Sequence, residues 1–244
     1  MILIIFRRES MKAHSRDWEF LPISAKRAGS RRNLTIFSEL QKEIVLGIRP
    51  PNSTLLEMEL AEEYGASQGT VREALMLLQE LGLVYRQAHR GTTVADCRQA
   101  DALELLRLRL GIECRGIKRT FQKNLQPLLQ TLEERLSRML DAAKAGDEYL
   151  LSVHDRAFHL HLFEYADLPL VTPVLQRCLV HAHRYKILNH PQERDLIETA
   201  NRHRVIIEAL EAADEKRTVR ELSTHITTIV DFGPNLIGTD ELHG

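Results

Sequence analysis

Residues 56–94 read "LEMELAEEYGASQGTVREALMLLQELGLVYRQAHRGTTV". Gly65 separates two amphipathic segments, and glycine tolerates the positive φ that a tight turn between helices requires. Ser67 is a good N-cap for the second segment. The first helix is expected to bury Leu56, Leu60, Ala61 and Tyr64, and the second Val71, Ala74, Leu75 and Leu78. Two β-prone runs around His89-Arg90-Gly91 complete the element order of a winged helix-turn-helix, a module that places one helix in the major groove of DNA.

The start of the second helix and the tip of the wing are the expected DNA-contacting surface. Polar residues outside the buried stripe gather there, and the partial positive charge of a helix N-terminus suits phosphates and base edges. The candidate DNA-binding residues are Ser67, Gln68, Gly69, Thr70, Arg72, His89, Arg90 and Gly91. The alternative is a plain helical hairpin with a surface loop, and the ordered turn, cap, stripe and wing argue against it.

Composition indicates a globular protein with room for two domains. The chain has 244 residues, 43% of them hydrophobic, and a formal net charge of -1, which disfavours a sequence-independent coat on nucleic acid. Residues 1–35 hold eight Lys/Arg against three Asp/Glu, whereas residues 36–96 hold five against nine. We therefore expect residues 1–35 to form a flexible basic extension that assists a winged domain at 36–96. An alternative is that translation starts at Met11.

Cysteine usage and hydropathy predict a cytoplasmic protein. The cysteines Cys97, Cys114 and Cys178 are far apart and form no CxxC motif, which is typical of a reduced compartment. No apolar run reaches the length of about 18 residues expected of a membrane span. We therefore expect no membrane partner.

Beyond a linker at 97–99, the sequence predicts an all-helical domain over 100–232, followed by a C-terminal tail at 233–244. Six helical segments are expected near 100–123, 125–145, 147–166, 171–189, 192–213 and 215–230, with breaks at Pro, Gly and Asp positions. The predicted fold is mostly α: an N-terminal winged helix-turn-helix and a C-terminal helical bundle.

The bundle carries one candidate metal site. Asp155 and His159 are four residues apart and share a helix face, and His203 and His225 lie on the apolar stripes of two other helices. One carboxylate oxygen and three imidazole nitrogens suit a divalent transition metal such as Zn, Ni, Mn or Fe. The alternative is a set of hydrogen-bonded core histidines with no metal.

Residues 36–96 resemble the DNA-binding domain of GntR-family bacterial transcription regulators. The motifs that carry the resemblance are Leu56-Glu57, Leu60-Ala61, "GASQGTVREAL", "LQELGLV" and Arg90-Gly91. Gln68, Thr70 and Met76 depart from the residues usual in the family, while Arg72 is kept. These departures bear on DNA affinity and operator sequence rather than on the fold.

The helical region resembles the FCD effector domain, in its shorter six-helix version. Its "D-x-x-F-H" motif appears at Asp155–His159, its later histidine motif begins at His203, and its terminal histidine is His225. The resemblance implies that these four side chains bind a metal. It also implies that Arg109, in "RLGIE", pairs with an acidic effector, although a surface pair with Glu113 is the alternative. His181, on the helix that lines the cavity in the family, is a further candidate for effector binding.

The predicted function is a ligand-responsive transcription regulator, a repressor, that acts as a homodimer on a palindromic double-stranded DNA operator. It is expected to sense a small organic acid through a metal-containing helical domain. An alternative is a regulator that senses the metal ion itself. A more remote alternative, a metal-dependent hydrolase, is suggested by the His154-Asp155 dipeptide, but no histidine lies between residues 90 and 153 to complete such a site. We therefore expect no enzymatic activity.

Overall fold

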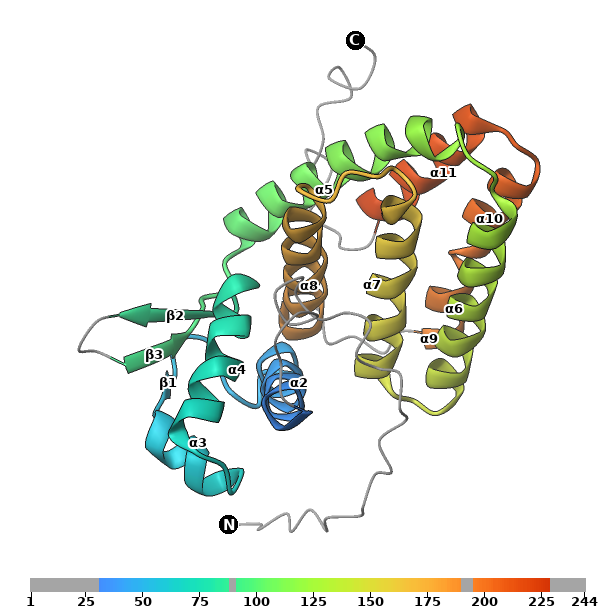
Figure 1. Cartoon of the computed structure of the whole chain (residues 1–244). Helices are drawn as coiled ribbons and strands as arrows, with labels where there is room; N and C mark the ends of the chain where they lie inside the picture. Colours follow the sequence, from blue (N-terminus) through green and yellow to red (C-terminus); the bar gives the residue numbers. More distant parts are fainter. Residues whose placement is uncertain (1–30, 88–90, 190–194, 229–244) are drawn as a thin grey trace.

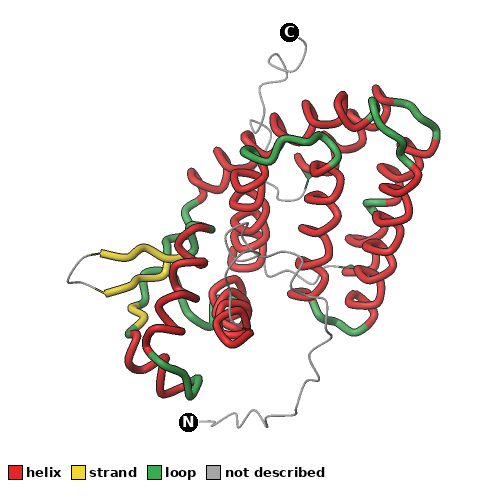
Figure 2. The backbone as a smooth tube through the Cα atoms, viewed as in Figure 1, coloured by secondary structure: helices red, strands yellow, loops and turns green. Residues whose placement is uncertain are grey.

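The computed structural model of the protein describes residues 31–87, 91–189 and 195–228. A winged part holds α2 (Arg31–Val45), β1 (Thr54–Leu55), α3 (Glu57–Glu63), α4 (Gln68–Glu80), β2 (Val84–Gln87) and β3 (Gly91–Val94). A helical part holds α5 (Gln99–Thr120), α6 (Gln126–Lys144), α7 (Glu148–Glu164), α8 (Thr172–Asn189), α9 (Leu196–Asn201), α10 (Arg204–Glu211) and α11 (Glu215–Thr227). Figure 2 shows strands only at the edge of the winged part, so the predicted fold class is confirmed.

The helix-turn-helix forms through the local signals of its sequence. Gly65 adopts φ 55°, which lets the chain reverse after α3. The Ser67 hydroxyl then accepts a hydrogen bond from the Thr70 backbone N–H, 3.1 Å away, and so caps α4. The expected α4 stripe of Val71, Ala74, Leu75 and Leu78 is fully buried. Leu56 differs from its expected burial: it is the N-cap of α3 and stays 44% exposed.

The wing is a three-stranded antiparallel sheet in the order β1-β3-β2. Thr54 pairs with Thr93, and Val84 pairs with Val94. The inward side chains of this sheet join one hydrophobic core with α2, α3 and α4, which includes Ile36, Leu40, Leu60, Leu75, Val84 and Val94. The core thus fixes the wing against helix α4.

Several expected boundaries are wrong at the residue level. Helix α2 begins at Arg31, so residues 31–35 are helical and do not belong to a flexible extension. Gln99 is the first residue of α5 rather than the last of the linker. The segment expected as one helix over 192–213 is interrupted at Arg202-His203, which gives seven helices in the described bundle instead of six. The expectations for residues 1–30 and 233–244, and for His89 and Arg90, fall outside the described residues.

Helix α8 lies between the winged part and the rest of the bundle (Figure 1). Its Val180 joins the hydrophobic core of the winged part, and α8 also packs along α5 and α7. Gly47, at φ 74°, follows α2, and a Cβ there would lie only 2.6 Å from the Leu188 side chain on α8. The positive φ favours glycine here, and a Cβ would in addition force the Leu188 side chain to move. Within the described ranges, no helix is both long and apolar enough to cross a membrane.

Candidate metal centre and nucleic-acid interface

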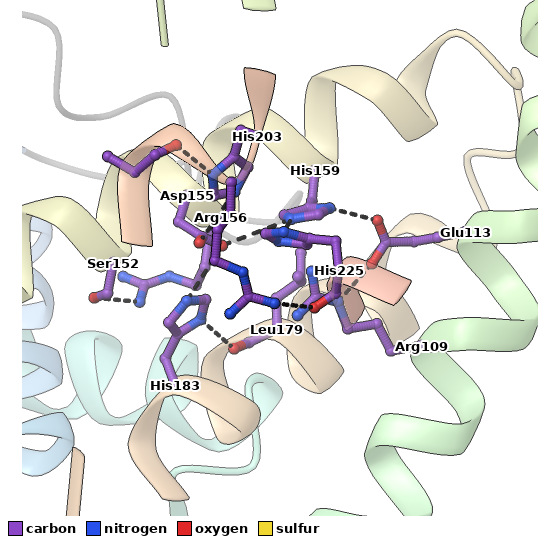
Figure 3. A network of polar contacts seen from close by, with 12 residues as sticks. Arg109, Glu113, Ser152, Asp155, Arg156, His159, Leu179, His183, His203 and His225 are labelled. Carbon is purple, nitrogen blue, oxygen red and sulfur yellow. Dashed lines mark hydrogen bonds and ion pairs between the residues drawn. The ribbon is translucent and has the colours of Figure 1, made fainter. Parts of the chain in front are cut away.

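Three helices bring the four predicted metal ligands together. Helix α7 supplies Asp155 and His159, His203 is the N-cap of α10, and α11 supplies His225. All four side chains are buried, and one ligand atom from each lies within 4.8 Å of the others. Figure 3 shows the imidazole rings gathered around the Asp155 carboxylate. The interruption between α9 and α10 thus occurs at a cluster residue.

Hydrogen bonds on the outer side of the cluster orient two of the rings. His159 Nδ1 lies 2.6 Å from Glu113 Oε2, and His203 Nδ1 lies 3.0 Å from the Ala200 carbonyl oxygen. Both oxygens accept, so each Nδ1 carries the proton that it donates. In the neutral ring, the lone pair is then on Nε2, which faces the interior of the cluster.

Burial and charge favour an ionised carboxylate among neutral imidazoles. Burial alone would raise the pKa of Asp155, but His183 and His203 beside it hold that pKa well below its usual range. Burial lowers the pKa of His225 far below its ordinary value, and the nearby rings of His203 and His159 lower it further. Burial also lowers the pKa of His159, although Glu113 opposes that shift. Neutral imidazoles offer the lone pairs that metal coordination needs.

Several polar atoms of the cluster find no hydrogen bond of good geometry among the described residues. These atoms are Asp155 Oδ1, His203 Nε2 and His225 Nδ1. His203 Nε2 lies 3.2 Å from Asp155 Oδ2, and the Nε2 atoms of His159 and His225 lie 3.2 Å apart. A single proton between two ring nitrogens satisfies only one lone pair, whereas a divalent cation accepts all of them. The donor set therefore fits a transition metal, and Glu113 and the Ala200 carbonyl provide the outer contacts that such sites use.

Arg109 is turned into the bundle, where it forms the i,i+4 pair with Glu113 as a buried pair rather than as a surface pair. It is fully buried, and its Nε donates to Glu113 Oε1 over 2.6 Å. Glu113 in turn contacts His159, so Arg109, Glu113 and His159 form one chain of contacts. Burial would raise the pKa of Glu113, but the neighbouring His159 and Arg109 lower it. Within the described residues, both Nη groups of Arg109 are buried without a hydrogen-bond partner, which leaves two N–H-bearing groups available inside the bundle.

The two histidines of α8 lie on different sides of the helix, and the one nearest the cluster is His183 rather than the predicted His181. His181 does not face the cluster: its Nε2 lies 3.0 Å from the Leu81 carbonyl oxygen, at the end of recognition helix α4. His183, which is not among the predicted site residues, lies with Nε2 3.2 Å from Asp155 Oδ1, and its Nδ1 donates to the Leu179 carbonyl. His183 follows Leu175 and Leu179 at intervals of four residues on a buried face, and this spacing was the available signal.

The candidate DNA-binding residues of α4 lie together at its exposed N-terminal end. Ser67, Gln68 and Gly69 are exposed, and Thr70 is half-buried with its hydroxyl 2.9 Å from that of Ser67. Arg72 is exposed one turn further along and is bonded to Glu57. Of the wing-tip candidates, Gly91 is the exposed first residue of β3, while His89 and Arg90 lie in the segment that is not described.

Comparison with known proteins assigns both parts of the chain. Residues 33–94 match the family of bacterial regulatory proteins known as gntR, and residues 104–228 match the FCD domain. The chain belongs to the GntR family. It is therefore a DNA-binding transcription regulator, and its relatives are regulators rather than enzymes.

Individual relatives resemble the chain over most of its length. The transcriptional repressor RspR of Escherichia coli is 26% identical over 81% of this chain and 86% of its own length. The regulator McbR of Escherichia coli is 25% identical over 80% of this chain and 90% of its own length. A solved structure of Escherichia coli McbR/YncC superposes with a TM-score of 0.67 at 20% identity, and it covers 81% of this chain and 94% of that one. This likeness shows that the fold is shared.

In this GntR-family chain, Arg184 ties the helical part to the winged part. Arg184 is fully buried on α8, and its Nη groups donate to the backbone carbonyls of Ala95, at 2.7 Å, and Asp96, at 3.1 Å. These carbonyls lie just after the last strand of the wing. Together with the hydrogen bond between His181 and Leu81, the two hydrogen bonds of Arg184 connect α8 to both ends of the segment that follows α4. Neither contact was anticipated from the sequence.

Proposed function

We propose that this protein is a repressor that responds to a small organic acid and requires a divalent transition metal. Asp155, His159, His203 and His225 would hold the metal, and Arg109 would pair with the carboxylate of the effector. The regulator would act as a homodimer on a palindromic operator in the cytoplasm. The names of the relatives RspR, a repressor, and McbR, a regulator, support regulation of transcription and favour repression.

The observation that carries the metal proposal is the orientation of the rings. Glu113 and the Ala200 carbonyl hold the protons of His159 and His203 on the outer nitrogens, so lone pairs converge on an ionised carboxylate. Burying such an arrangement without a cation is costly, since lone pairs would face each other in a medium of low dielectric constant. A bound metal supplies a positive charge and open coordination positions for an oxygen ligand.

Arg109 supports the choice of an acid as effector. Its two unpartnered Nη groups are planar N–H donors, which match the two oxygens of a carboxylate. Its Nε bond to Glu113 fixes the direction of the guanidinium and leaves these donors in place. Glu113 balances the charge of Arg109 before the effector binds. Among the residues that the structure describes, no anion bonds the Nη groups, so an acidic ligand would not have to displace one.

Helix α8 supplies a route from effector to DNA. His183 contacts Asp155 at one side of α8, while His181 and Arg184, two and one residues away, hold backbone carbonyls of the winged part. A shift of α8 that follows a change at Asp155 would therefore alter the docking of recognition helix α4. The effector needs only to bind one docking arrangement better than another in order to shift the population.

A homodimer is supported by exposed apolar side chains on the helical part. Leu108 on α5 is 51% exposed and Val174 on α8 is 44% exposed, on two helices that pack against each other. Leu170, just before α8, is 91% exposed. Large apolar side chains that stay exposed on a regulator are candidates for a subunit interface. A dimer would also supply two recognition helices, as a palindrome requires.

Metal content tests the proposal most directly. Purified protein is stripped with a chelator, reconstituted with Zn²⁺, Ni²⁺, Mn²⁺ or Fe²⁺ in turn, and analysed by native mass spectrometry and elemental analysis. One ion per chain is expected in the wild type, and a loss of at least tenfold in occupancy in His203→Ala and Asp155→Ala. His161→Ala, a change of the same kind on α7 but outside the cluster, should keep the ion. Wild type that takes up none of these ions would refute the metal proposal.

The same samples separate the acid sensor from the metal sensor. In an acid sensor, metal stabilises the fold and permits effector binding, but operator affinity changes only when the acid is added. In a metal sensor, the stripped protein folds, and adding the ion alone changes operator affinity. Gel-shift titrations at one fixed salt concentration, with and without metal, decide between them.

A further inference from the structure

The carboxylate of Glu57 lies between the recognition helix and the wing. It accepts hydrogen bonds from Arg72 on α4, with Nε and Nη2 at 3.1 and 2.8 Å from Oε2. Its other oxygen accepts from Arg86 Nη2 on β2 at 2.9 Å. Glu57 itself is the first residue of α3 and carries no capping role for α4. One side chain therefore joins three elements of the DNA-binding module.

The exposed fractions of the three side chains show that Glu57, Arg72 and Arg86 do not form an ion pair in the core. The Arg72 side chain is 53% exposed and that of Arg86 is 30% exposed, whereas Glu57 is only 22% exposed. The carboxylate thus lies beneath two arginines whose outer parts reach solvent. Hydrogen bonding to Arg72, opposed by partial burial, lowers the pKa of Glu57, so the carboxylate is ionised at neutral pH. The bonds to Arg72 use Nε and Nη2, and Nη1 remains available.

Charge alone gives Glu57 no favourable part in DNA binding. The winged region over 36–96 already holds nine acidic residues against five basic ones, and Glu57 offsets the positive charge of Arg72 and Arg86. A carboxylate at this surface repels phosphates, and its removal should strengthen non-specific binding. Its benefit must therefore come from geometry. A long arginine side chain that is already held in one rotamer loses less entropy when it binds a base or a phosphate.

We propose that Glu57 is a positioning residue for operator recognition, which holds Arg72 of the recognition helix and Arg86 of the wing in the orientation that meets DNA. The bidentate contact fixes the Arg72 guanidinium plane, and the shared carboxylate fixes its position relative to the wing. Specific operators benefit from this fixed geometry, whereas random DNA does not. This inference rests on the proposed contact of Arg72 with the operator.

A positioning role of Glu57 and a role that only neutralises the two arginines predict opposite changes in operator affinity in one experiment. Operators are first selected from random DNA with the wild-type protein, and affinities for the selected operator and for a random duplex are then measured at several salt concentrations. Glu57→Gln should lower operator affinity about tenfold and leave or raise affinity for the random duplex. If Glu57 only neutralises the arginines, Glu57→Gln binds both DNAs more tightly, and the inference is wrong.

A matched control and a double-mutant cycle complete the test. Glu59→Gln makes the same change on an exposed carboxylate of the same helix, and it should leave the ratio of specific to random binding unchanged. Arg72→Ala should itself lower operator affinity about tenfold, and adding Glu57→Gln to it should cost much less than in the wild type. Fully additive losses would overturn the positioning role. An Arg72→Ala variant with wild-type affinity would instead remove the proposed Arg72 contact on which the inference rests.

Discussion

His183 on α8 lies with its Nε2 atom 3.2 Å from Oδ1 of Asp155, whereas His203 contacts the other oxygen of this carboxylate, Oδ2. The next residue along α8, Arg184, donates to the carbonyls of Ala95 and Asp96 at the end of the wing. A contact with the candidate metal cluster and a contact with the winged part are thus made by adjacent residues. This adjacency makes the coupling between the two parts open to direct test.

Replacing His183 by Leu should uncouple effector from operator. The leucine keeps an apolar side chain on the buried face but loses the contact with Asp155, so α8 no longer responds to changes at that carboxylate. Without effector, we expect operator affinity to change less than threefold. The change in operator affinity that the effector causes should shrink at least fivefold, which corresponds to a loss of about 1 kcal/mol in coupling energy. Metal occupancy is measured alongside. A variant that responds to effector as the wild type does would contradict the α8 route.

Arg109→Lys should spare the metal but weaken the acid. Lysine keeps the positive charge near Glu113 and lacks the planar pair of Nη donors that a carboxylate needs. The loss expected is about 1–3 kcal/mol in effector affinity, measured by calorimetry with small organic acids. Metal content should equal that of the wild type. If acids bind equally well to the variant, Arg109 is a structural residue only.

Acidification should loosen the contact between α8 and the winged part through His181. Burial lowers the pKa of His181 to about 4, and the bond to the Leu81 carbonyl only partly opposes this shift. The folded-state pKa lies below the unfolded value of about 6.5, so the unfolded chain binds more protons between these limits. The stability from neutral His181 is therefore complete above pH 6.5 and falls as the pH drops towards 4.

The matched variant for this effect is His181→Gln, whose amide can still donate to the Leu81 carbonyl but does not titrate in this range. Because His181 is partly exposed to solvent, we expect the wild type to lose about 1 kcal/mol more than the variant between pH 7 and pH 5. Urea unfolding at the two pH values measures the difference. Equal losses would exclude His181 as the source.

Ser67→Ala should destabilise the recognition helix. The Ser67 hydroxyl accepts the Thr70 N–H and also bonds the Thr70 hydroxyl, so alanine leaves an N–H at the start of α4 without its partner. The cost expected is about 1 kcal/mol in the free energy of unfolding. Ser67→Asp restores an acceptor and should recover most of the stability. Its added negative charge should nevertheless weaken DNA binding, which separates the capping role from DNA contact.

Charges placed at the exposed apolar residues of the helical part should dissociate the proposed dimer. The wild type is expected at about 56 kDa by light scattering, twice the 28.0 kDa of one chain. Leu108→Glu combined with Val174→Glu should shift it towards the monomer. Ile48→Glu, on a residue that is 65% exposed in the winged part, serves as the control. Wild type that runs as a monomer at micromolar concentration would rule out a stable dimer.

Short-range sequence signals predicted most of the winged part. The Gly65 turn, the Ser67 cap and the α4 stripe depend on residues a few positions apart, and each forms as expected. The helix break at Arg202-His203 was missed because no proline or glycine marks it. The apolar spacing of Ile206, Ile207 and Leu210 continues past it as if one helix were present.

Contacts between distant elements were harder to predict. Asp155 and His159 share a helix, so their proximity followed from spacing, and His203 and His225 were identified by their apolar faces and by family motifs. His181 and His183 are two residues apart on one helix, and sequence alone does not tell which side of α8 faces the winged part. The contacts of Arg184 depend on that packing, whereas those of Glu57 depend on how α3 packs against α4 and β2. No local pattern marks either set.

Helix α5 begins directly after the carbonyls that Arg184 holds and passes Arg109 before it reaches the far end of the bundle. At 1.5 Å per residue, the ten residues from Gln99 to Arg109 form a rigid arm of about 15 Å. A tilt of about 5° at Arg109 would move Gln99 by about 1.3 Å. The winged part is attached at this end of α5, so such a tilt around one guanidinium would displace the whole winged part.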